Sequence, residues 1–189
     1  LPAIVNRLSD EAGARVIVLS ERWADWARDF APKSRICIVG NPVGIPSAVP
    51  AARSDRGGGS VLYLGLICDA KGSFDLLQAW ARARERLPNW RLRVGGNGEV
   101  ERFLAEAEAL GIRGDIDYLG WVSGDAKEAA LAQADIFVLP SYKEGMPVSI
   151  LEAMVYGAAV VATPVGGVPD MMVAGHHGLL VDAGDVDAL

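Results

Sequence analysis

The sequence is short of cysteine, of basic charge and of long apolar runs, and each shortage argues against a class of protein. Two cysteines among 189 residues, Cys37 and Cys68, are too few for a disulfide scaffold. Both lie in apolar runs, which favours buried free thiols. The formal net charge of −6 argues against a nucleic-acid partner, because general nucleic-acid binders present a basic face to phosphates. No run reaches the ~20 apolar residues of a membrane span.

The two ends of the chain look incomplete. The chain opens on Leu1-Pro2, without an initiator methionine or a basic leader. It closes on "GDVDAL", which reads as a helix interrupted in its first turn. A length of 189 residues suffices for one substantial domain, or for one domain and a piece of another. We therefore expect a fragment of a longer protein, trimmed at both ends.

Short apolar strands alternate with amphipathic helices along most of the chain. Leu76, Trp80, Ala83 and Leu87 recur at spacings of four, three and four, which is one face of an α-helix. Strands this short and apolar, set between helices, predict an α/β fold with a Rossmann-like, doubly wound parallel sheet. The strands are predicted at residues 14–20, 34–40, 61–65, 91–95, 116–120, 135–140, 159–163 and 178–182, with helices at 125–133 and 148–156 among others.

A segment rich in proline, glycine and serine interrupts this alternation at residues 41–60. Such a composition disfavours both strand ladders and helices, so it predicts a linker. Residues 1–40 then form one part of the chain, and residues 61–189 form the main domain, truncated at its carboxyl end. Ligands of doubly wound sheets bind outside the carboxyl ends of the strands, so the loops that follow the strands are the places to search.

The first such loop reads "GLICDAKGS" and begins at Gly65, where a strand ends. Lys71 and Gly72 precede the next helix, and Ser73 is its predicted N-cap. Free backbone N–H groups beside a lysine would suit an anion. A solvated Lys71 next to a simple turn is the alternative, and the loop alone does not decide between them.

Two further loops carry glycines or an aromatic residue. "GGNGEVERF" fits the dinucleotide pattern G-x-G-x-x-G poorly, because Glu101 stands where the third glycine should be. Gly96 and Gly98 more simply let the backbone approach a ligand or a neighbouring element. In "GWVSGD", Trp121 and Val122 could wall a base pocket or merely cover the edge of the sheet. The backbone amides of the "TPVGGVPD" loop could face the same crevice.

The stretch "PSYKEGMPVSILEAM" places Glu144 before a predicted helix and Glu152 inside it. Eight residues span about 12 Å along a helix, too far for two glycosidase carboxylates, which lie roughly 5–10 Å apart. The spacing fits two hydroxyl-binding groups at the ends of a nucleotide sugar, with the helix start between them for a diphosphate. Ordinary surface charges are the alternative. His176-His177 has no partner at metal-ligand spacing, so we expect no metal site.

These loops occur in one recognisable order: "VLYLGLICDAKGSFDLLQAW", "RLRVGGNGE", "IDYLGWVSG", "ADIFVLPSYKEGMPVSILEAM" and "AVVATPVGGVPD". Together they resemble the carboxyl-terminal domain of retaining glycosyltransferases of the GT-B fold, family 4. These are the glycosyl transferases group 1 of bacterial polysaccharide and lipopolysaccharide synthesis. The resemblance covers about residues 35–189, and it is greatest for the capsule and exopolysaccharide branch.

The resemblance implies that residues 61–189 bind a nucleotide-sugar donor, a UDP-, GDP- or ADP-sugar. Glu144 would bind hydroxyls of the donor hexose and Lys71 would neutralise the diphosphate, which are the two catalytic roles. Glu152 would hold the ribose hydroxyls. The other implied donor-binding positions are Gly65, Gly72, Gly96, Gly98, Trp121, Val122, Gly145, Met146 and Val148.

The resemblance also implies transfer of a hexose with retention, without a metal or other cofactor, to a polysaccharide, lipopolysaccharide or lipid-linked acceptor. Residues 1–40 would be the last elements of an amino-terminal, acceptor-binding domain that this chain lacks. We therefore expect the fragment to bind donor weakly and not to turn over. The full-length protein is expected in the cytoplasm, with possible peripheral contact at the inner face of the membrane.

One residue departs from the family pattern. Leu66 follows Gly65 where the family usually has an arginine that joins the lysine on the diphosphate. A charge-assisted hydrogen bond is worth roughly 1.5–3 kcal/mol, so donor binding should be weaker. Pro147 also removes a backbone donor from the turn before the helix. The Leu66 departure makes a non-catalytic binding module one alternative function. A sugar-nucleotide epimerase of similar fold is another, although an epimerase would not need this set of loops.

Overall fold

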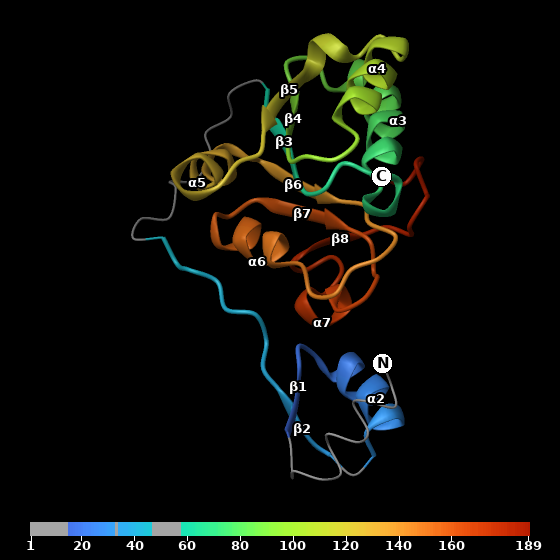
Figure 1. Cartoon of the computed structure of the whole chain (residues 1–189). Helices are drawn as coiled ribbons and strands as arrows, with labels where there is room; N and C mark the ends of the chain where they lie inside the picture. The colour runs from blue at the N-terminus through green and yellow to red at the C-terminus, as the bar shows by residue number, and fades with distance from the viewer. Residues whose placement is uncertain (1–14, 33, 47–57) are drawn as a thin grey trace.

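The computed structural model describes residues 15–32, 34–46 and 58–189, and Figure 1 shows two separate parallel sheets within them. The larger sheet has the strand order β5-β4-β3-β6-β7-β8, and every neighbouring pair in it is parallel. Its strands are β3 (Ser60–Leu64), β4 (Arg91–Gly95), β5 (Ile116–Gly120), β6 (Ile136–Leu139), β7 (Ala159–Ala162) and β8 (Gly178–Leu180).

Helices cover both faces of the larger sheet, and the sequence of the central strand shows why. In β3, the four consecutive residues Val61–Leu64 are all buried, which is the mark of a strand packed on both faces. Two helices lie on one side and two on the other: α3 (Ser73–Ala83) and α4 (Val100–Ala109), then α5 (Gly124–Gln133) and α6 (Val148–Val155). The predicted doubly wound α/β fold is confirmed.

The direction of winding reverses at β3. The chain runs from β3 outward through β4 to β5, then returns to β6 on the other side of β3 and continues to β8. Because β3 pairs with both β4 and β6, the loops that follow β3 and β6 emerge side by side. Such a reversal opens a crevice at the carboxyl ends of the strands, where ligands bind in this class of fold.

The smaller sheet pairs β1 (Arg15–Val18) with β2 (Arg35–Ile38), and α2 (Glu21–Phe30) connects them. The hydroxyl of Ser20 caps α2 by accepting a hydrogen bond from the backbone N–H of Trp23 at 3.4 Å. Of the predicted linker, residues 47–57 lie outside the described residues, and Ser60 already belongs to β3. The assignment of residues 1–40 to another domain stays a prediction.

Short helices complete the larger domain: η1 (Asp69–Lys71), η2 (Arg84–Arg86), η3 (Arg113–Asp115) and α7 (Val168–Met171). At the carboxyl end, the carboxylate of Asp185 accepts a hydrogen bond from the backbone N–H of Ala188 at 3.0 Å. No helix in the described ranges is long and apolar enough to cross a membrane.

Two local predictions were wrong. Ser73 is the first residue of α3, and its hydroxyl donates to the carbonyl of Cys68 at 3.1 Å, so it does not cap the helix. Gly72 occupies the cap position instead, with φ of 65°. Cys37 and Cys68 are free thiols, but each is half-buried, because β2 and the loop before η1 lie near the surface.

Candidate functional site

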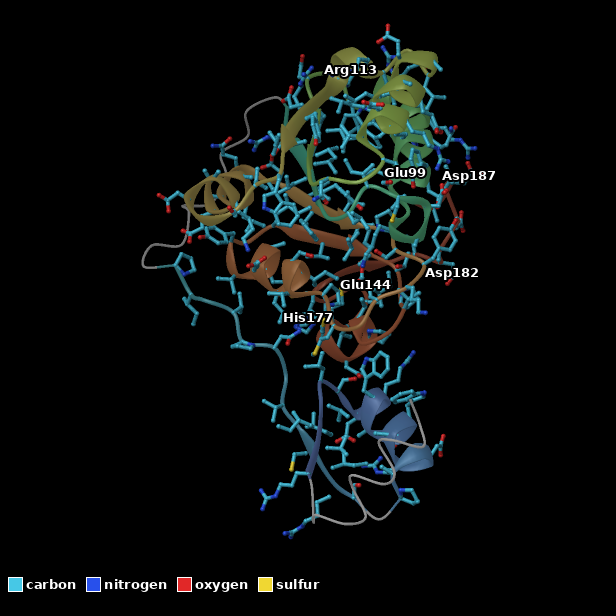
Figure 2. All side chains as sticks on the ribbon, viewed as in Figure 1. Glu99, Arg113, Glu144, His177, Asp182 and Asp187 are labelled. Atoms are coloured by element: carbon cyan, nitrogen blue, oxygen red, sulfur yellow. The ribbon has the colours of Figure 1, made fainter. Side chains whose placement is uncertain are left out.

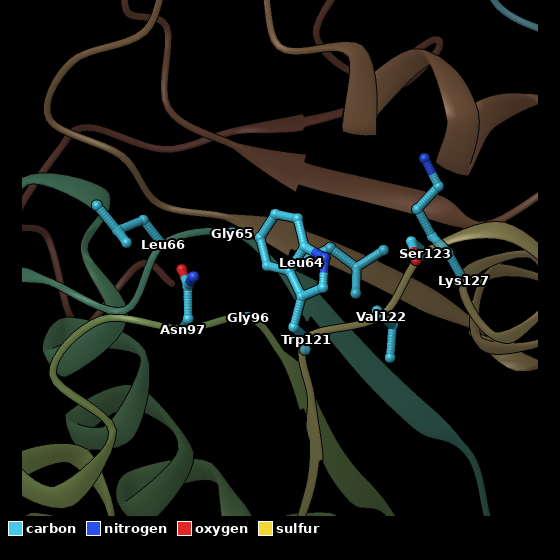
Figure 3. Close-up of a pocket in the computed structure, with 10 residues that line it drawn as sticks. Leu64, Gly65, Leu66, Gly96, Asn97, Trp121, Val122, Ser123 and Lys127 are labelled. Carbon is cyan, nitrogen blue, oxygen red and sulfur yellow. The ribbon is translucent and has the colours of Figure 1, made fainter.

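A cavity of about 540 Å³ lies at the carboxyl ends of β3, β4 and β5. Figure 3 shows Leu66 and Asn97 at one end of this cavity and Lys127 at the other, with the Trp121 ring between them. Its lining residues are Leu64, Gly65, Leu66, Gly95, Gly96, Asn97, Trp121, Val122, Ser123 and Lys127. The cavity therefore lies at the edge of the sheet where the fold predicts a ligand.

Four of the predicted binding residues line the cavity: Gly65, Gly96, Trp121 and Val122. The side chain of Trp121 is 70% exposed, so the ring presents a free apolar face and does not serve to cover the core. Leu66 is 48% exposed beside it. An exposed aromatic ring beside backbone N–H and C=O groups can stack on a planar ligand ring and hydrogen-bond to its polar edge.

Two tyrosines, Tyr63 buried and Tyr118 half-buried, hold the loops around the cavity. Tyr63 on β3 donates a hydrogen bond to the carbonyl of Leu66 at 2.7 Å, and Tyr118 on β5 donates to the carbonyl of Gly96 at 2.9 Å. Burial, followed by the charges of Cys68 and Glu144, raises the pKa of Tyr63, so this phenol stays a neutral donor. Neither tyrosine was predicted as a site residue, because each reads as an ordinary apolar strand position.

Gly96 and Gly98 allow the loop after β4 to pack closely against the loop after β3. A Cβ at Gly96 would overlap the carbonyl of Gly65, and one at Gly98 would overlap the carbonyl of Ile67. The backbone N–H of Ile67 donates to the carbonyl of Asn97 at 2.7 Å, which fixes the two loops together. Gly96 also lines the cavity, whereas Gly98 lies outside its lining.

Lys71 and Glu144 form an ion pair across the neighbouring loops. The ammonium of Lys71 lies 2.7 Å from Oε1 of Glu144, and the hydroxyl of Ser141 donates to the same oxygen at 2.6 Å. Only 8% of the Glu144 side chain is exposed, and in Figure 2 it is labelled near the middle of the view, whereas Asp187 lies at the edge. Among the described residues no group donates to the other oxygen, Oε2, which leaves it able to accept a ligand hydroxyl.

Backbone packing brings this first pair together. Gly72 has φ of 65°, and a Cβ there would overlap the carbonyl of Pro140 at the end of β6. The backbone N–H of Tyr142 donates to the carbonyl of Ala70 at 3.0 Å. Asp69, in the same turn, is paired with Arg102 at 3.0 Å, and that guanidinium lowers the pKa of the Asp69 carboxyl. The loop after β3 is therefore held firmly against the loop after β6.

A second pair joins Lys127 of α5 to Glu152 of α6. The ammonium of Lys127 lies 2.6 Å from Oε1 of Glu152, and Lys127 also lines the cavity. The Glu152 side chain is 19% exposed, more than that of Glu144. Sequence reasoning missed Lys127. One signal was available, because a lysine in the first turn of a helix opposes the helix dipole and needs another reason to be there.

The start of α6 is arranged to accept an anion. No side chain caps this helix at Pro147, and its first turn holds no acidic residue. Gly145 and Met146 precede it, and Val148 is its first residue. The backbone N–H of Ile150 donates to the carbonyl of Pro147 at 3.2 Å, whereas no described residue accepts from the N–H groups of Val148 and Ser149. These two N–H groups and the helix dipole therefore face the space between Glu144 and Glu152.

The expected role of the Gly166-Gly167 loop needs correction. The backbone N–H of Gly167 donates to the carbonyl of Gly145 at 2.6 Å, so this amide does not face the crevice. A Cβ at Gly166 would overlap the carbonyl of Glu144, which explains the glycine there. The loop supports the turn before α6 from behind.

The rings of His176 and His177 meet edge to face, with centroids 4.5 Å apart, and Nδ1 of His177 accepts a hydrogen bond from the backbone N–H of Val173 at 3.0 Å. Within the part of the chain that the structure describes, no three His, Cys, Asp or Glu side chains gather as metal ligands. Metal independence stays a prediction.

The fold and the site together define a class of protein. The larger domain has a Rossmann-like fold. Its cavity, the uncapped start of α6 and the two Lys–Glu pairs all lie at the edge of the parallel sheet where ligands bind in this class of fold. The chain belongs to the glycosyl transferases group 1 family, whose sequence profile matches residues 58–189. The match covers the larger sheet and leaves out the smaller one.

Individual relatives agree with this assignment. The chain is 32% identical to the 2-deoxystreptamine N-acetyl-D-glucosaminyltransferase of Streptomyces fradiae, over 100% of this chain and 48% of that protein. It is 32% identical to the lipopolysaccharide core biosynthesis glycosyltransferase LpsE of Rhizobium meliloti, over 89% of this chain and 48% of that protein. The chain thus spans about half the length of these curated relatives.

Solved structures share the fold. The lipopolysaccharide outer core galactosyltransferase WaaB superposes with a TM-score of 0.75 and 27% identity, over 91% of this chain and 49% of that one. Anabaena HepE, solved in complex with UDP, superposes with a TM-score of 0.81 and 20% identity, over 98% of this chain and 54% of that one. The larger domain is therefore one Rossmann-like half of a GT-B fold.

Proposed function

We propose that this chain is the donor-binding half of a retaining glycosyltransferase. The whole protein would move a hexose from a nucleotide diphosphate sugar to a polysaccharide, lipopolysaccharide or lipid-linked acceptor. The observation that carries the proposal is the placement of two carboxylates, Glu144 and Glu152, on either side of an uncapped helix start at the ligand edge of the sheet. A nucleotide sugar has diols at both ends and a diphosphate between them, and this arrangement is its complement.

Each end of the donor has a proposed place. The base would lie in the cavity against Trp121 and the backbone of Val122, and the ribose hydroxyls would bind Glu152. Lys127 would orient the Glu152 carboxylate through their ion pair. The hexose hydroxyls would bind the free Oε2 of Glu144, whose other oxygen already holds Lys71 and Ser141.

The diphosphate would lie at the start of α6 and near Lys71. As the glycosidic bond breaks, negative charge develops on the departing nucleoside diphosphate. A lysine and a helix dipole fixed in advance stabilise that charge without reorganisation, which is electrostatic catalysis. This proposal needs no metal. The acceptor would bind to the amino-terminal half, so residues 1–189 would bind donor without transferring sugar.

UDP is the nucleotide that the comparisons favour. Structures similar to this chain include HepE with UDP, HepE with UDP-glucose and TarM with UDP. GDP- and ADP-sugars remain the competing donors, because the described cavity residues present backbone groups that accommodate more than one base edge.

Calorimetry with UDP, GDP and ADP tests the proposal. We expect one of the three to bind at submillimolar to millimolar concentration, and Glu152→Ala to weaken it about tenfold because the ribose loses a charged acceptor. Lys127→Arg is the matched control, since it keeps a cation beside Glu152. Absence of binding at millimolar concentration by all three nucleotides would refute the donor-site assignment.

A second candidate is a binding module without catalysis, and Leu66 favours it. Leu66 is 48% exposed at the cavity, and it gives the diphosphate no charge at the position where the family usually places an arginine. Joining the chain to its amino-terminal half and assaying sugar transfer separates the two functions. Transfer supports the glycosyltransferase, whereas donor binding without transfer supports the module. Release of an epimerised donor would instead indicate the sugar-nucleotide epimerase.

A further inference from the structure

We infer that Asn41, in the segment between the two sheets, is a positioning residue of the donor site. Its side-chain amide holds the turn between Glu144 and α6 in the shape that the diphosphate requires. This inference rests on the proposed function, and it gives the segment next to the smaller sheet a part in nucleotide binding.

The contact joins distant parts of the chain. Nδ2 of Asn41 donates a hydrogen bond to the carbonyl of Met146 at 2.9 Å, across 105 residues of sequence. Asn41 is half-buried, so water competes with this bond less than it would at a fully exposed side chain. A second, longer contact comes from the same side, where Nε1 of Trp23 on α2 lies 3.5 Å from the carbonyl of Gly145.

The turn is therefore held from two directions. The carbonyl of Gly145 accepts from the backbone N–H of Gly167 at 2.6 Å, and the carbonyl of Met146 accepts from Asn41 at 2.9 Å. Gly167 belongs to the domain that carries the turn, whereas Asn41 comes from outside it. Without Asn41 the Gly145 carbonyl would stay anchored, but the Met146 carbonyl would not.

The geometry of the peptide unit carries this restraint to the anion site. In a planar trans peptide the carbonyl and the N–H point in opposite directions. Fixing the Gly145 carbonyl toward Gly167 turns the N–H of Met146 away from that loop. Fixing the Met146 carbonyl sets the plane of its bond to Pro147, and Pro147 is the residue from which α6 starts. Asn41 thus controls the direction in which the first N–H groups of α6 point.

The residue type matters for this role. An asparagine amide donates to a carbonyl, whereas an aspartate carboxylate has no proton to donate near neutral pH and repels it. Asn41→Asp keeps the size of the side chain and reverses the interaction. Asn41→Ala removes the interaction without adding charge, which makes it the second variant if the aspartate disturbs folding.

The experiment compares a nucleoside diphosphate with its nucleoside, on the full chain. Calorimetry first selects the best ligand among UDP, GDP and ADP, and both variants are then titrated with that diphosphate and with the matching nucleoside. Ile45→Ala is the control, because Ile45 lies in the same segment and is 81% exposed. Thermal unfolding of each variant accompanies the titrations.

We expect Asn41→Asp to weaken the diphosphate about tenfold and Asn41→Ala about threefold, since one hydrogen bond and its directional effect are lost. Binding of the nucleoside should change by less than about twofold, because the base and ribose do not contact this turn. Ile45→Ala should leave both ligands unchanged.

Equal weakening of diphosphate and nucleoside would overturn the inference and reduce Asn41 to a general structural tie. Unchanged diphosphate binding in both variants would overturn it as well. If the unmodified chain binds none of the three diphosphates, the proposed function fails, and the role of Asn41 fails with it. These results are distinct, because only the last is seen without any substitution.

Discussion

The two Lys–Glu pairs lie at the same edge of one sheet but are built differently. Lys71 and Glu144 come from loops that follow the adjacent strands β3 and β6, and Glu144 is 8% exposed with Ser141 as a further partner. Lys127 and Glu152 come from two helices, and Glu152 is 19% exposed with Lys127 as its ion-pair partner. The first pair is fixed by backbone packing, and the second by side chains alone.

This difference teaches what each pair can do. A carboxylate held by a lysine, a serine and close backbone keeps one geometry, which suits the end of a ligand where a bond breaks. A pair between side chains on two helices can adjust by changing rotamer, which suits recognition. The backbone around Gly72 should therefore tolerate substitution far less than the backbone around Gly124, at the start of α5.

The largest expected effect is a loss of folding stability when the glycine beside the first pair is replaced. Comparing it with a glycine near the second pair tests whether backbone packing fixes only the first. Gly72→Ala places a side chain at φ of 65° and against the carbonyl of Pro140. Left-handed strain and overlap together should lower the free energy of unfolding by about 3 kcal/mol, a fall in Tm of roughly 6–12 °C. Differential scanning calorimetry measures both quantities.

Gly124→Ala is the matched control. Gly124 also has a positive φ, 53°, but no atom lies within 4 Å of a Cβ built there. Only the strain remains, so we expect a loss of about 1 kcal/mol and roughly 2–4 °C in Tm. Equal losses in the two variants would show that close backbone packing does not distinguish the two pairs.

The next effect separates the two ends of the ligand. Glu152→Gln should weaken UDP and UDP-glucose alike, each about tenfold, because both carry the ribose. Glu144→Gln should weaken UDP-glucose about tenfold relative to UDP, since only the sugar donor has hexose hydroxyls. Calorimetry with the two ligands on both variants gives the four affinities.

Glutamine keeps the size of the side chain, so each change removes charge without leaving a cavity. A Glu144→Gln variant that loses UDP and UDP-glucose equally would contradict the hexose role. Glu144 would then not distinguish the hexose end of the ligand from the nucleotide end. It would instead affect binding of the diphosphate through Lys71.

The smallest effect concerns Leu66, which lies at the end of the cavity opposite Lys127 (Figure 3). Leu66→Arg should tighten UDP about threefold, because a half-exposed guanidinium gains part of a charge-assisted hydrogen bond to the diphosphate. Uridine has no phosphate and should bind unchanged. The gain should decrease as salt is raised, since exposed charges are screened.

Leu66→Met is the uncharged control, because it has a similar volume and adds no cation. The affinity for UDP is measured at two salt concentrations for both variants. A salt-independent gain with methionine as well as arginine would indicate apolar contact, and it would argue against a diphosphate near Leu66.

Much of the fold could be predicted from the sequence because the signals are local. The strand predicted at residues 116–120 coincides with β5, and that predicted at 91–95 coincides with β4. The other predicted strands of the larger sheet differ from the observed ones by one or two residues at their ends, where fraying makes boundaries weakest. The Ser73 cap was wrong because Gly72, at positive φ, takes the turn that a serine cap would otherwise make.

The predicted roles of the site residues stay predictions, but their positions in the candidate site follow from the sequence most directly where one stretch holds the residues concerned. Glu144 and Glu152 stand in one stretch with a helix start between them, so the sequence displays their relation directly. Three further residues lie outside residues 140–154. Lys127 and Asn41 contact that stretch, whereas Tyr63 hydrogen-bonds to the neighbouring loop after β3. The sequence around each of these residues does not indicate which loop its side chain contacts.

The sequence by itself determined the alternation of strands and helices, and hence a parallel sheet with a ligand edge, because apolar periodicity acts over a few residues. Only the tertiary structure decided which cation meets which carboxylate. Lys71 and Glu144 are 73 residues apart, and Lys127 and Glu152 are 25 apart. They meet because winding reverses at β3, and strand order is set by packing of the whole sheet, which no local pattern encodes.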